Sequence, residues 1–322
     1  MGTPHQFVKL LSPCGDSATP RPLISVMIPT FNCATYLRTA LASVLEQDMG
    51  SNLMQIEVVD DCSTDDPEAV ANELGNGRVH FYRQVQNGGH TKNFETCMNR
   101  AKGKYLHLLH GDDKVEPGFY ATLLPMLEAN EAVGAAFCAN QVIDEYDKVF
   151  KSSVQVAPMA GVVNNFFKLM LQRQWVQTPS IIVRRSVYET IGMFDSRLAW
   201  CEDWEMWTRI AAHYAVAYSP KALASYRVHT KSNTSRHVKS GENLRDLKRF
   251  KTIVQDYVDA GDRKWFIRHM NNKVAKSAFN AARTFYAAGD KMSAKQQLLE
   301  ALYLDTDLRI KLRLIGLYLK KK

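Results

Sequence analysis

The feature that most constrains the fold is an order of strand, loop and helix that recurs after Pro22. Short runs rich in strand-forming residues are each followed by a polar loop and then by a helical pattern or a helix-opening proline. The predicted strands are Leu23–Ile28, Gln55–Val59, Val79–Tyr82 and Tyr105–Leu109. Strands that alternate with helices predict an α/β fold with a mostly parallel sheet, flanked by helices on both faces.

Two aspartate pairs follow strands of this predicted sheet. Asp60 and Asp61 come after the second strand, and Asp112 and Asp113 come after the fourth. Sheets of this kind bind ligands beyond the carboxyl ends of their strands. Either pair alone could merely cap the following helix, which is a common role of Asp. Four carboxylates at one edge would repel one another without a cation, so together they favour a divalent metal site.

The length of 322 residues exceeds the usual size of one domain. We expect a flexible leader over residues 1–21, which contain several prolines and glycines, and a catalytic domain over residues 22–238. The pattern after about Gly241 is helical, which predicts a C-terminal helical region over residues 239–322. No stretch is long and apolar enough for a membrane span, and no signal peptide is visible, so we expect a cytoplasmic protein. Its six cysteines are scattered singly, which is typical of reduced thiols.

The chain carries a formal net charge of +8, and much of the excess lies in its last residues. No nucleic-acid-binding motif accompanies this charge, so we expect no nucleic-acid partner. The final segment is a basic, apolar-rich helix candidate, with one stripe formed by Leu308, Leu312, Ile315 and Leu319. This stripe could rest on an anionic membrane surface, as in a peripheral membrane protein, or could dock on the protein itself. The sequence favours neither alternative.

Several motifs resemble those of the family 2 glycosyltransferases of GT-A fold. The first strand and turn end in Pro29-Thr30-Phe31-Asn32, similar to the family's Pro-x-Tyr-Asn. Residues 58–65 resemble Val-Asp-Asp-Gly-Ser-Thr-Asp, with Cys62 where Gly is usual. Gly111-Asp112-Asp113 occupies the place of the DxD motif, with His110 where many members have a first aspartate. A packed or solvated histidine is the commoner interpretation of His110, and a direct metal ligand is the alternative.

Two further motifs extend the resemblance along the chain. Residues 200–209 resemble the family's Glu-Asp motif at the start of a helix, and residues 226–235 resemble its Tyr-Arg-x-His…Ser segment. A weaker likeness connects Gly88, Gly89 and Lys92 with the family's Asn-x-Gly loop, where backbone and cation could approach phosphate. The resemblance implies a Rossmann-like GT-A sheet and an inverting hexosyltransferase that uses a nucleotide-sugar donor.

The resemblance also implies a role for each matched residue. Asp61 would contact the base of the nucleotide, Asp112 the ribose or diphosphate, and Asp113 the metal, which would be Mg²⁺ or Mn²⁺. Asp203 would be the catalytic base that accepts the proton of the acceptor hydroxyl. The full predicted nucleotide-sugar set is Pro29, Thr30, Phe31, Asn32, Asp60, Asp61, Gly89, Lys92, Asp112 and Asp113.

Other assignments are less specific. Arg227 and His229 could bind the diphosphate or the metal, although His229 could equally be a loop histidine without a ligand. Trp200, Glu202 and Trp204 are expected on the acceptor side. For the two tryptophans the reason is that aromatic faces stack on sugar rings. UDP is the best single guess for the nucleotide, and a saccharide or a lipid-linked saccharide of a bacterial surface polysaccharide for the acceptor. A nucleotide-sugar-binding scaffold without transferase activity is the alternative that Cys62 and His110 leave open.

Overall fold

The computed structural model of the chain describes residues 7–14, 20–229, 233–302, 304 and 306–320. The chain divides into two compact units that interleave in sequence. Unit 1 comprises Met1–Met170, Gln174–Ser196 and Ile210–Val228, and unit 2 comprises Leu171–Arg173, Arg197–Arg209 and His229–Lys322. The division differs from the predicted boundary at residue 238, because the segment with the Glu-Asp motif groups with the C-terminal helices.

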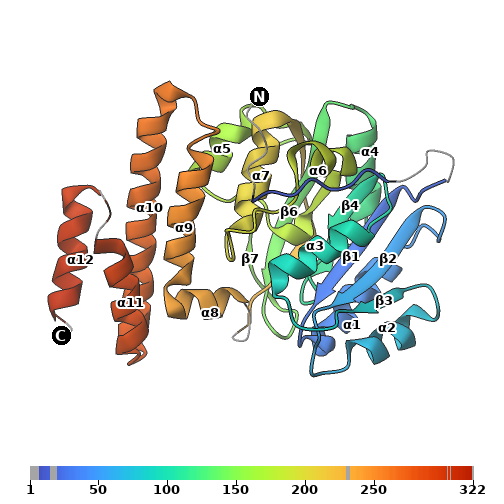
Figure 1. Cartoon of the computed structure of the whole chain (residues 1–322), viewed down its shortest axis with the longest axis horizontal. Coiled ribbons are helices and arrows are strands. Elements are labelled where there is room, and N and C mark those ends of the chain that lie inside the picture. The colour runs from blue at the N-terminus through green and yellow to red at the C-terminus, as the bar shows by residue number, and fades with distance from the viewer. Residues whose placement is uncertain (1–6, 15–19, 230–232, 303, 305, 321–322) are drawn as a thin grey trace. The chain divides into compact units, whose positions relative to one another are not determined.

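Four parallel strands form the first half of the sheet in unit 1 (Figure 1). They are β1 (Ile24–Thr30), β2 (Met54–Asp60), β3 (His80–Arg83) and β4 (Tyr105–Leu108), in the order β3-β2-β1-β4. Helices α1 (Ala34–Leu45), α2 (Pro67–Gly75) and α3 (His90–Arg100) connect them. The predicted alternation of strands and helices is confirmed in this half.

The second half of the sheet is mixed in direction. Strand β9 (Ile181–Arg184) lies antiparallel to both β4 and β6 (Val133–Ile143), and β6 runs parallel to β10 (Ala215–Arg227). Three short strands pair antiparallel with this half: β5 (Lys114–Val115), β7 (Val149–Ser152) and β8 (Gly161–Val162). All strand pairs of the first half are thus parallel, whereas the second half combines the parallel pair β6–β10 with antiparallel pairs.

Helices cover the parallel strands on both faces, as the sequence predicts. On one face, Ile24, Val26 and Ile28 of β1 join the core with apolar residues of α1, α2 and α4 (Phe119–Glu128). The residues that alternate with these along β1 point to the opposite face of the sheet. On that face lies α3, whose Asn93 donates from Nδ2 to the carbonyl of Val59 in β2 at 2.9 Å. Burial on both faces explains why these strands read as continuous apolar runs.

The N-terminal segment 7–14 packs against the rest of unit 1, which corrects the prediction of a flexible leader for this part. Leu11 is 1% exposed, and its N–H donates to the carbonyl of Tyr188 in α6 (Arg185–Ile191) at 3.1 Å. Gly192, at φ +85°, leaves room for Val8 where a Cβ would clash. Apolar burial and backbone hydrogen bonds hold this segment in place, and the sequence does not show them. Residues 1–6 and 15–19 lie outside the described residues.

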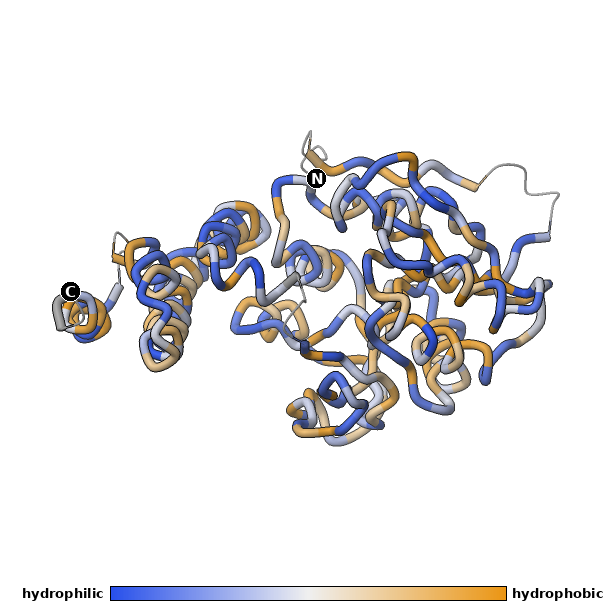
Figure 2. The backbone as a smooth tube through the Cα atoms, turned by 90° about the horizontal axis from the view of Figure 1, so that it is seen from below, coloured by the Kyte–Doolittle hydropathy of each residue, from blue (hydrophilic) through white to orange (hydrophobic). Residues whose placement is uncertain are grey.

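Unit 2 is helical, which confirms the predicted C-terminal helical region. It contains α8 (Asn233–Ser240), α9 (Glu242–Val254), α10 (Ala260–Ala287), α11 (Lys291–Leu302) and α12 (Leu308–Lys320). Part of α5 (Phe166–Gln172) and most of α7 (Glu202–His213) also belong to it. Hydrophobic and hydrophilic residues are interleaved along the C-terminal helices (Figure 2). Among the described residues, no helix combines the length and the apolar character that crossing a membrane requires.

Candidate functional site

Two loops at the carboxyl ends of β1 and β2 are joined through Asn32. Its backbone N–H donates to Ser63 Oγ at 2.9 Å, and its Oδ1 accepts the N–H of Thr64 at 2.7 Å. Asn32 and Cys62 both adopt left-handed backbone conformations, with φ of 52° and 61°. This conformation favours glycine, which explains physically why Gly would suit the position of Cys62.

Asp60 organises its own loop. Its carboxylate is fully buried, and it accepts hydrogen bonds from the N–H and the hydroxyl of Ser63. Arg83 at the end of β3 donates from Nε to Asp60 Oδ2 at 2.8 Å. These contacts fix the loop after β2.

Asp61 binds the glycine loop that follows β3. Its two carboxylate oxygens accept the N–H groups of Gly88 and Gly89 at 2.8 and 2.9 Å, and Gln84 Nε2 donates to Oδ1 at 3.2 Å. The predicted residues Asp61 and Gly89 are thus in direct contact. Lys92 is exposed nearby on α3, where its Nζ pairs with Glu95 at 3.0 Å.

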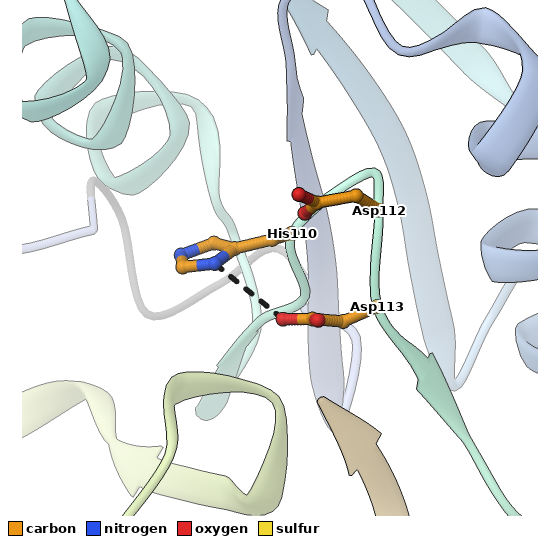
Figure 3. A group of neighbouring side chains, drawn as sticks. All are labelled: His110, Asp112 and Asp113. Carbon is orange, nitrogen blue, oxygen red and sulfur yellow. Dashed lines mark ion pairs between the residues drawn. The ribbon is translucent and has the colours of Figure 1, made fainter. Parts of the chain in front are cut away.

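His110, Asp112 and Asp113 form a cluster at the loop between β4 and β5 (Figure 3). One nitrogen or oxygen from each residue can be chosen so that all lie within 4.8 Å of one another. Asp113 Oδ1 accepts the backbone N–H of Arg227 at 2.8 Å, whereas Oδ2 accepts no hydrogen bond from the part of the chain that the structure describes and lies 3.5 Å from His110 Nδ1. Burial first, and then the charge of Asp112, raises the pKa of Asp113 well above its usual range.

This cluster fits a divalent cation. A buried carboxylate oxygen without a hydrogen-bond donor, beside a second carboxylate, lacks the positive charge that a metal would supply. The ring of His110 stacks on Phe94 with 5.2 Å between centroids, so packing as well as the cluster sets its orientation. His110 therefore combines the two interpretations that the sequence left open: it is packed, and its Nδ1 faces the predicted metal ligand.

Arg227 supports this loop from the end of β10. Its guanidinium donates to the carbonyls of Asp112 and Asp144 at 2.7 and 2.9 Å and pairs with Asp147 at 2.7 Å. The side chain is 1% exposed. These contacts argue against the predicted direct contact with a diphosphate, because the guanidinium is already committed to protein oxygens within the loop scaffold.

Two tyrosines were missed by the sequence reasoning. The guanidinium of Arg227 lies over the ring of Tyr36 in α1, with 4.9 Å between the guanidinium carbon Cζ and the ring centroid. Burial raises the pKa of the Tyr36 phenol, and the charges of Glu145 and Asp112 and the Tyr146 phenol raise it further, so the turn around residues 144–147 borders the same site. Tyr36 lies four residues after Asn32, close to the predicted turn, which is a signal, but nothing in the sequence connects residues 144–147 with this loop.

The remaining predicted residues belong to unit 2. Between Cys201 and Ile210, all of which the structure describes, Asp203 is the single residue that is not buried. Trp204 is 3% exposed and packs on Phe250 with 4.4 Å between ring centroids, so the prediction of an acceptor-side stacking face is replaced by a core role. Glu202 is also buried, whereas Trp200 is partly exposed. The backbone carbonyl of His229 accepts the hydroxyl of Ser235 at 3.3 Å, and residues 230–232 of that motif lie outside the described residues.

Known proteins share this fold. A structure titled Staphylococcus aureus TarS 1-349 in complex with UDP-GlcNAc matches with a TM-score of 0.59 at 16% identity, covering 87% of this chain and 91% of that one. The mannosyltransferase PcManGT from Pyrobaculum calidifontis, in complex with GDP-Man and Mn²⁺, matches with a TM-score of 0.58 at 17% identity, covering 96% and 90%. An uncharacterized glycosyltransferase of Rickettsia prowazekii is 24% identical over 229 residues, which are 70% of each chain.

The family described as glycosyl transferase family 2 matches residues 25–192, more than half of the chain. The match begins at β1 and includes the aspartate pairs, the glycine loop and the His110 cluster, all of which the structure gathers at one edge of the sheet. On this match and this geometry, the chain belongs to glycosyl transferase family 2 and is a glycosyltransferase.

Proposed function

We propose that the protein is an inverting glycosyltransferase that moves a sugar from a nucleoside diphosphate sugar, with UDP as the favoured nucleotide, to an acceptor hydroxyl. The observation that carries this proposal is the His110, Asp112 and Asp113 cluster beside the loops that hold Asp60 and Asp61. A diphosphate with a divalent cation would neutralise the carboxylates that the fold concentrates here. The surrounding loops supply the polar groups that a nucleotide needs.

On the donor side, Asp61 is the proposed contact to the nucleotide base. A carboxylate has about four lone-pair positions, and three donors already hold this one in a fixed orientation, which leaves room for a base N–H. Pro29, Thr30, Phe31 and Asn32 line the adjoining turn, where Phe31 is 41% exposed and offers a ring face. Lys92 is the proposed cation that approaches phosphate, in exchange for its partly buried partner Glu95.

At the leaving-group side, Asp113 and Asp112 would hold Mg²⁺ or Mn²⁺, with His110 as an adjacent third donor. The bound ion would supply positive charge to the departing nucleoside diphosphate. Arg227 then acts on this step indirectly, because its guanidinium fixes the carbonyl of Asp112 and its N–H fixes Asp113. His229 remains a proposed second contact to diphosphate or metal.

Asp203 is the proposed catalytic base. It is the partly exposed residue in an otherwise buried stretch, so its carboxylate has access to an acceptor while its neighbours are fixed. A carboxylate within hydrogen-bond reach of the acceptor hydroxyl can take its proton as the oxygen attacks the anomeric carbon. Trp200, partly exposed and three residues earlier, remains the proposed aromatic face on the acceptor side.

The test is turnover of UDP-, GDP- and dTDP-sugars by the full chain with Mn²⁺, with Mg²⁺ and with a chelator. We expect metal-dependent hydrolysis or transfer with one nucleotide. Asp203→Asn should keep nucleotide binding and lose transfer, because it keeps the shape and removes the proton acceptor. Binding without turnover by the wild type would favour the scaffold alternative, and normal transfer by Asp203→Asn would refute the base assignment.

We further propose that helix α12 rests on an anionic membrane surface near a lipid-linked acceptor, as in a cytoplasmic enzyme that binds the membrane peripherally. Among residues 308–318 of this helix, whose side chains the structure describes, Leu314 is the buried one, whereas Leu308 and Leu312 are 70% and 59% exposed. The part of the stripe whose side chains the structure describes, Leu308, Leu312 and Ile315, therefore lies on the solvent side, and docking on the protein itself uses another face. Exposed Arg309, Lys311 and Arg313 accompany it, which suits anionic headgroups.

Flotation with vesicles of phosphatidylcholine, with and without phosphatidylglycerol, tests this surface. We expect the wild type to float with the anionic vesicles, and Leu308→Gln with Leu312→Gln to reduce this binding. Met292→Gln is the matched control, since Met292 is an 83% exposed apolar residue on another helix, α11. Equal flotation of the wild type and the double variant would remove the membrane role of α12.

A further inference from the structure

The carboxylate of Asp246 binds three consecutive backbone N–H groups in unit 2. Its Oδ2 accepts from Ala199 at 3.1 Å, from Trp200 at 2.7 Å and from Cys201 at 3.0 Å. Asp246 lies on α9 and has no exposed surface. The thiol of Cys201 lies 3.4 Å from the same oxygen, and burial raises its pKa well above the usual range, so it stays protonated and can donate.

These N–H groups stand immediately before α7, which begins at Glu202. Successive backbone N–H groups that converge on one point form an anion-binding nest, and a helix start adds positive potential. Here the chain supplies the anion itself, from a helix 45 residues further along. A buried carboxylate with three charge-assisted hydrogen bonds is a strong and directional anchor for the backbone.

Further contacts extend the anchor along α7. Tyr257 donates its hydroxyl to Glu205 Oε1 at 2.9 Å, and Glu205 pairs with Arg209 one turn later. Trp204 packs on Phe250, which lies one turn after Asp246 on α9. The residues on both sides of Asp203 are therefore fixed by the C-terminal helices, and Asp203 itself stays partly exposed.

We propose that Asp246 is a positioning residue for the catalytic base: it fixes residues 199–201 and so sets the direction in which Asp203 leaves the start of α7. This inference rests on the proposed role of Asp203 in transfer. It gives the C-terminal helical region a part in the reaction, in addition to any contact with a membrane.

The kinetic test compares Asp246→Ala, Asp246→Asn and Arg249→Ala in the full chain. Asp246→Ala should lower kcat for transfer by about ten- to a hundredfold, the scale expected when a reacting group is misplaced by about 1 Å, while KM for the nucleotide sugar stays within about twofold. Asp246→Asn should recover part of kcat, because its amide oxygen still accepts N–H groups. Arg249, 46% exposed, pairs with the other oxygen of Asp246, Oδ1. Arg249→Ala leaves the three N–H contacts of Oδ2 in place, so this variant should transfer normally.

A double variant separates positioning from general damage. In the Asp203→Asn background, Asp246→Ala should cost little further transfer, because the group that it positions is already gone. A full additional loss there, or wild-type kcat in Asp246→Ala, would overturn the inference. So would loss of nucleotide binding in Asp246→Asn, because this substitution keeps the shape of the side chain.

Hydrogen exchange gives a readout that needs no substrate. Amides 199–201 should exchange faster in Asp246→Ala and Asp246→Asn than in the wild type, while those of β1 and β2 stay unchanged. If the wild type lacks transfer with every donor, the proposed function fails by itself and the exchange result still reports the anchor. Unchanged exchange at 199–201 would reject the anchor even in an active enzyme.

Discussion

At the scale of single residues, a pH effect on stability is expected at His107. Its ring is buried, with Nδ1 3.1 Å from the hydroxyl of Tyr120 and Nε2 3.0 Å from the carbonyl of Pro179. Burial lowers its pKa from 6.5 to about 3. Between pH 6.5 and about pH 3, His107 is protonated in the unfolded chain but neutral in the folded chain. The free energy of unfolding is therefore unaffected by this residue above about pH 6.5 and falls as the pH decreases toward about 3.

We therefore expect His107→Gln to flatten the acid side of the stability profile. The wild type should lose up to about 1.4 kcal/mol of unfolding free energy per pH unit below about pH 6.5 through this residue, and the variant should lack this part of the slope. Gln keeps an amide that can replace one ring hydrogen bond. Urea unfolding at about pH 7.5 and about pH 5.5 measures the difference, and parallel slopes would show that His107 does not titrate in this window.

A second residue-scale prediction concerns Cys62, which holds φ at 61°. The left-handed conformation costs an L-residue about 1–2 kcal/mol, and glycine adds about 0.5–1 kcal/mol of backbone entropy to the unfolded chain. Cys62→Gly should thus stabilise the protein by about 0.5–1 kcal/mol. Ser51→Gly, at an exposed turn position without a positive φ, should instead destabilise it. Chemical denaturation of both variants checks the opposite signs.

At the scale of elements, the N-terminal segment offers a matched pair of leucines. Leu11 is 1% exposed and Leu10 is 47% exposed. Leu11→Ala should destabilise the protein by about 2–3 kcal/mol, because it leaves a cavity against α6, and Leu10→Ala should change stability by less than about 0.5 kcal/mol. Equal effects in thermal or urea unfolding would contradict the packing of this segment.

The elements also show what the sequence could predict. Each of the four early strands lies within two residues of its predicted bounds, since apolar runs, polar loops and helical spacing reflect local packing against a sheet. The direction of β9 and the packing of residues 7–12 were not predictable, because both depend on partners far away in the chain. The Glu-Asp motif points to Asp203 in the sequence. Asp246 belongs to no motif and contacts residues far away in the chain, so only the structure reveals its contacts.

At the scale of the whole molecule, donor and metal binding should stabilise the fold together. A ligand at about a hundred times its Kd adds about 2.7 kcal/mol to the unfolding free energy. We expect UDP-sugar with Mn²⁺ to raise Tm in the wild type. Asp113→Asn should lose the part of this Tm increase that depends on the metal, while its amide oxygen can still accept the N–H of Arg227. Glu131→Gln, at an exposed acid of unit 1, serves as control. Scanning calorimetry with and without chelator provides the measurement, and an undiminished metal effect in Asp113→Asn would contradict the site.

The interleaving of the two units in sequence has a consequence for synthesis on the ribosome. Residues 197–209 emerge before β10, the strand that completes the sheet of unit 1, yet the carboxylate that anchors the start of α7 emerges only with α9. Domains generally fold as their residues leave the ribosome, at about 5–20 residues per second. A nascent chain halted just after β10 should thus hold a completed sheet and an unanchored Glu-Asp motif, so the anchor of the proposed base forms only when α9 has emerged.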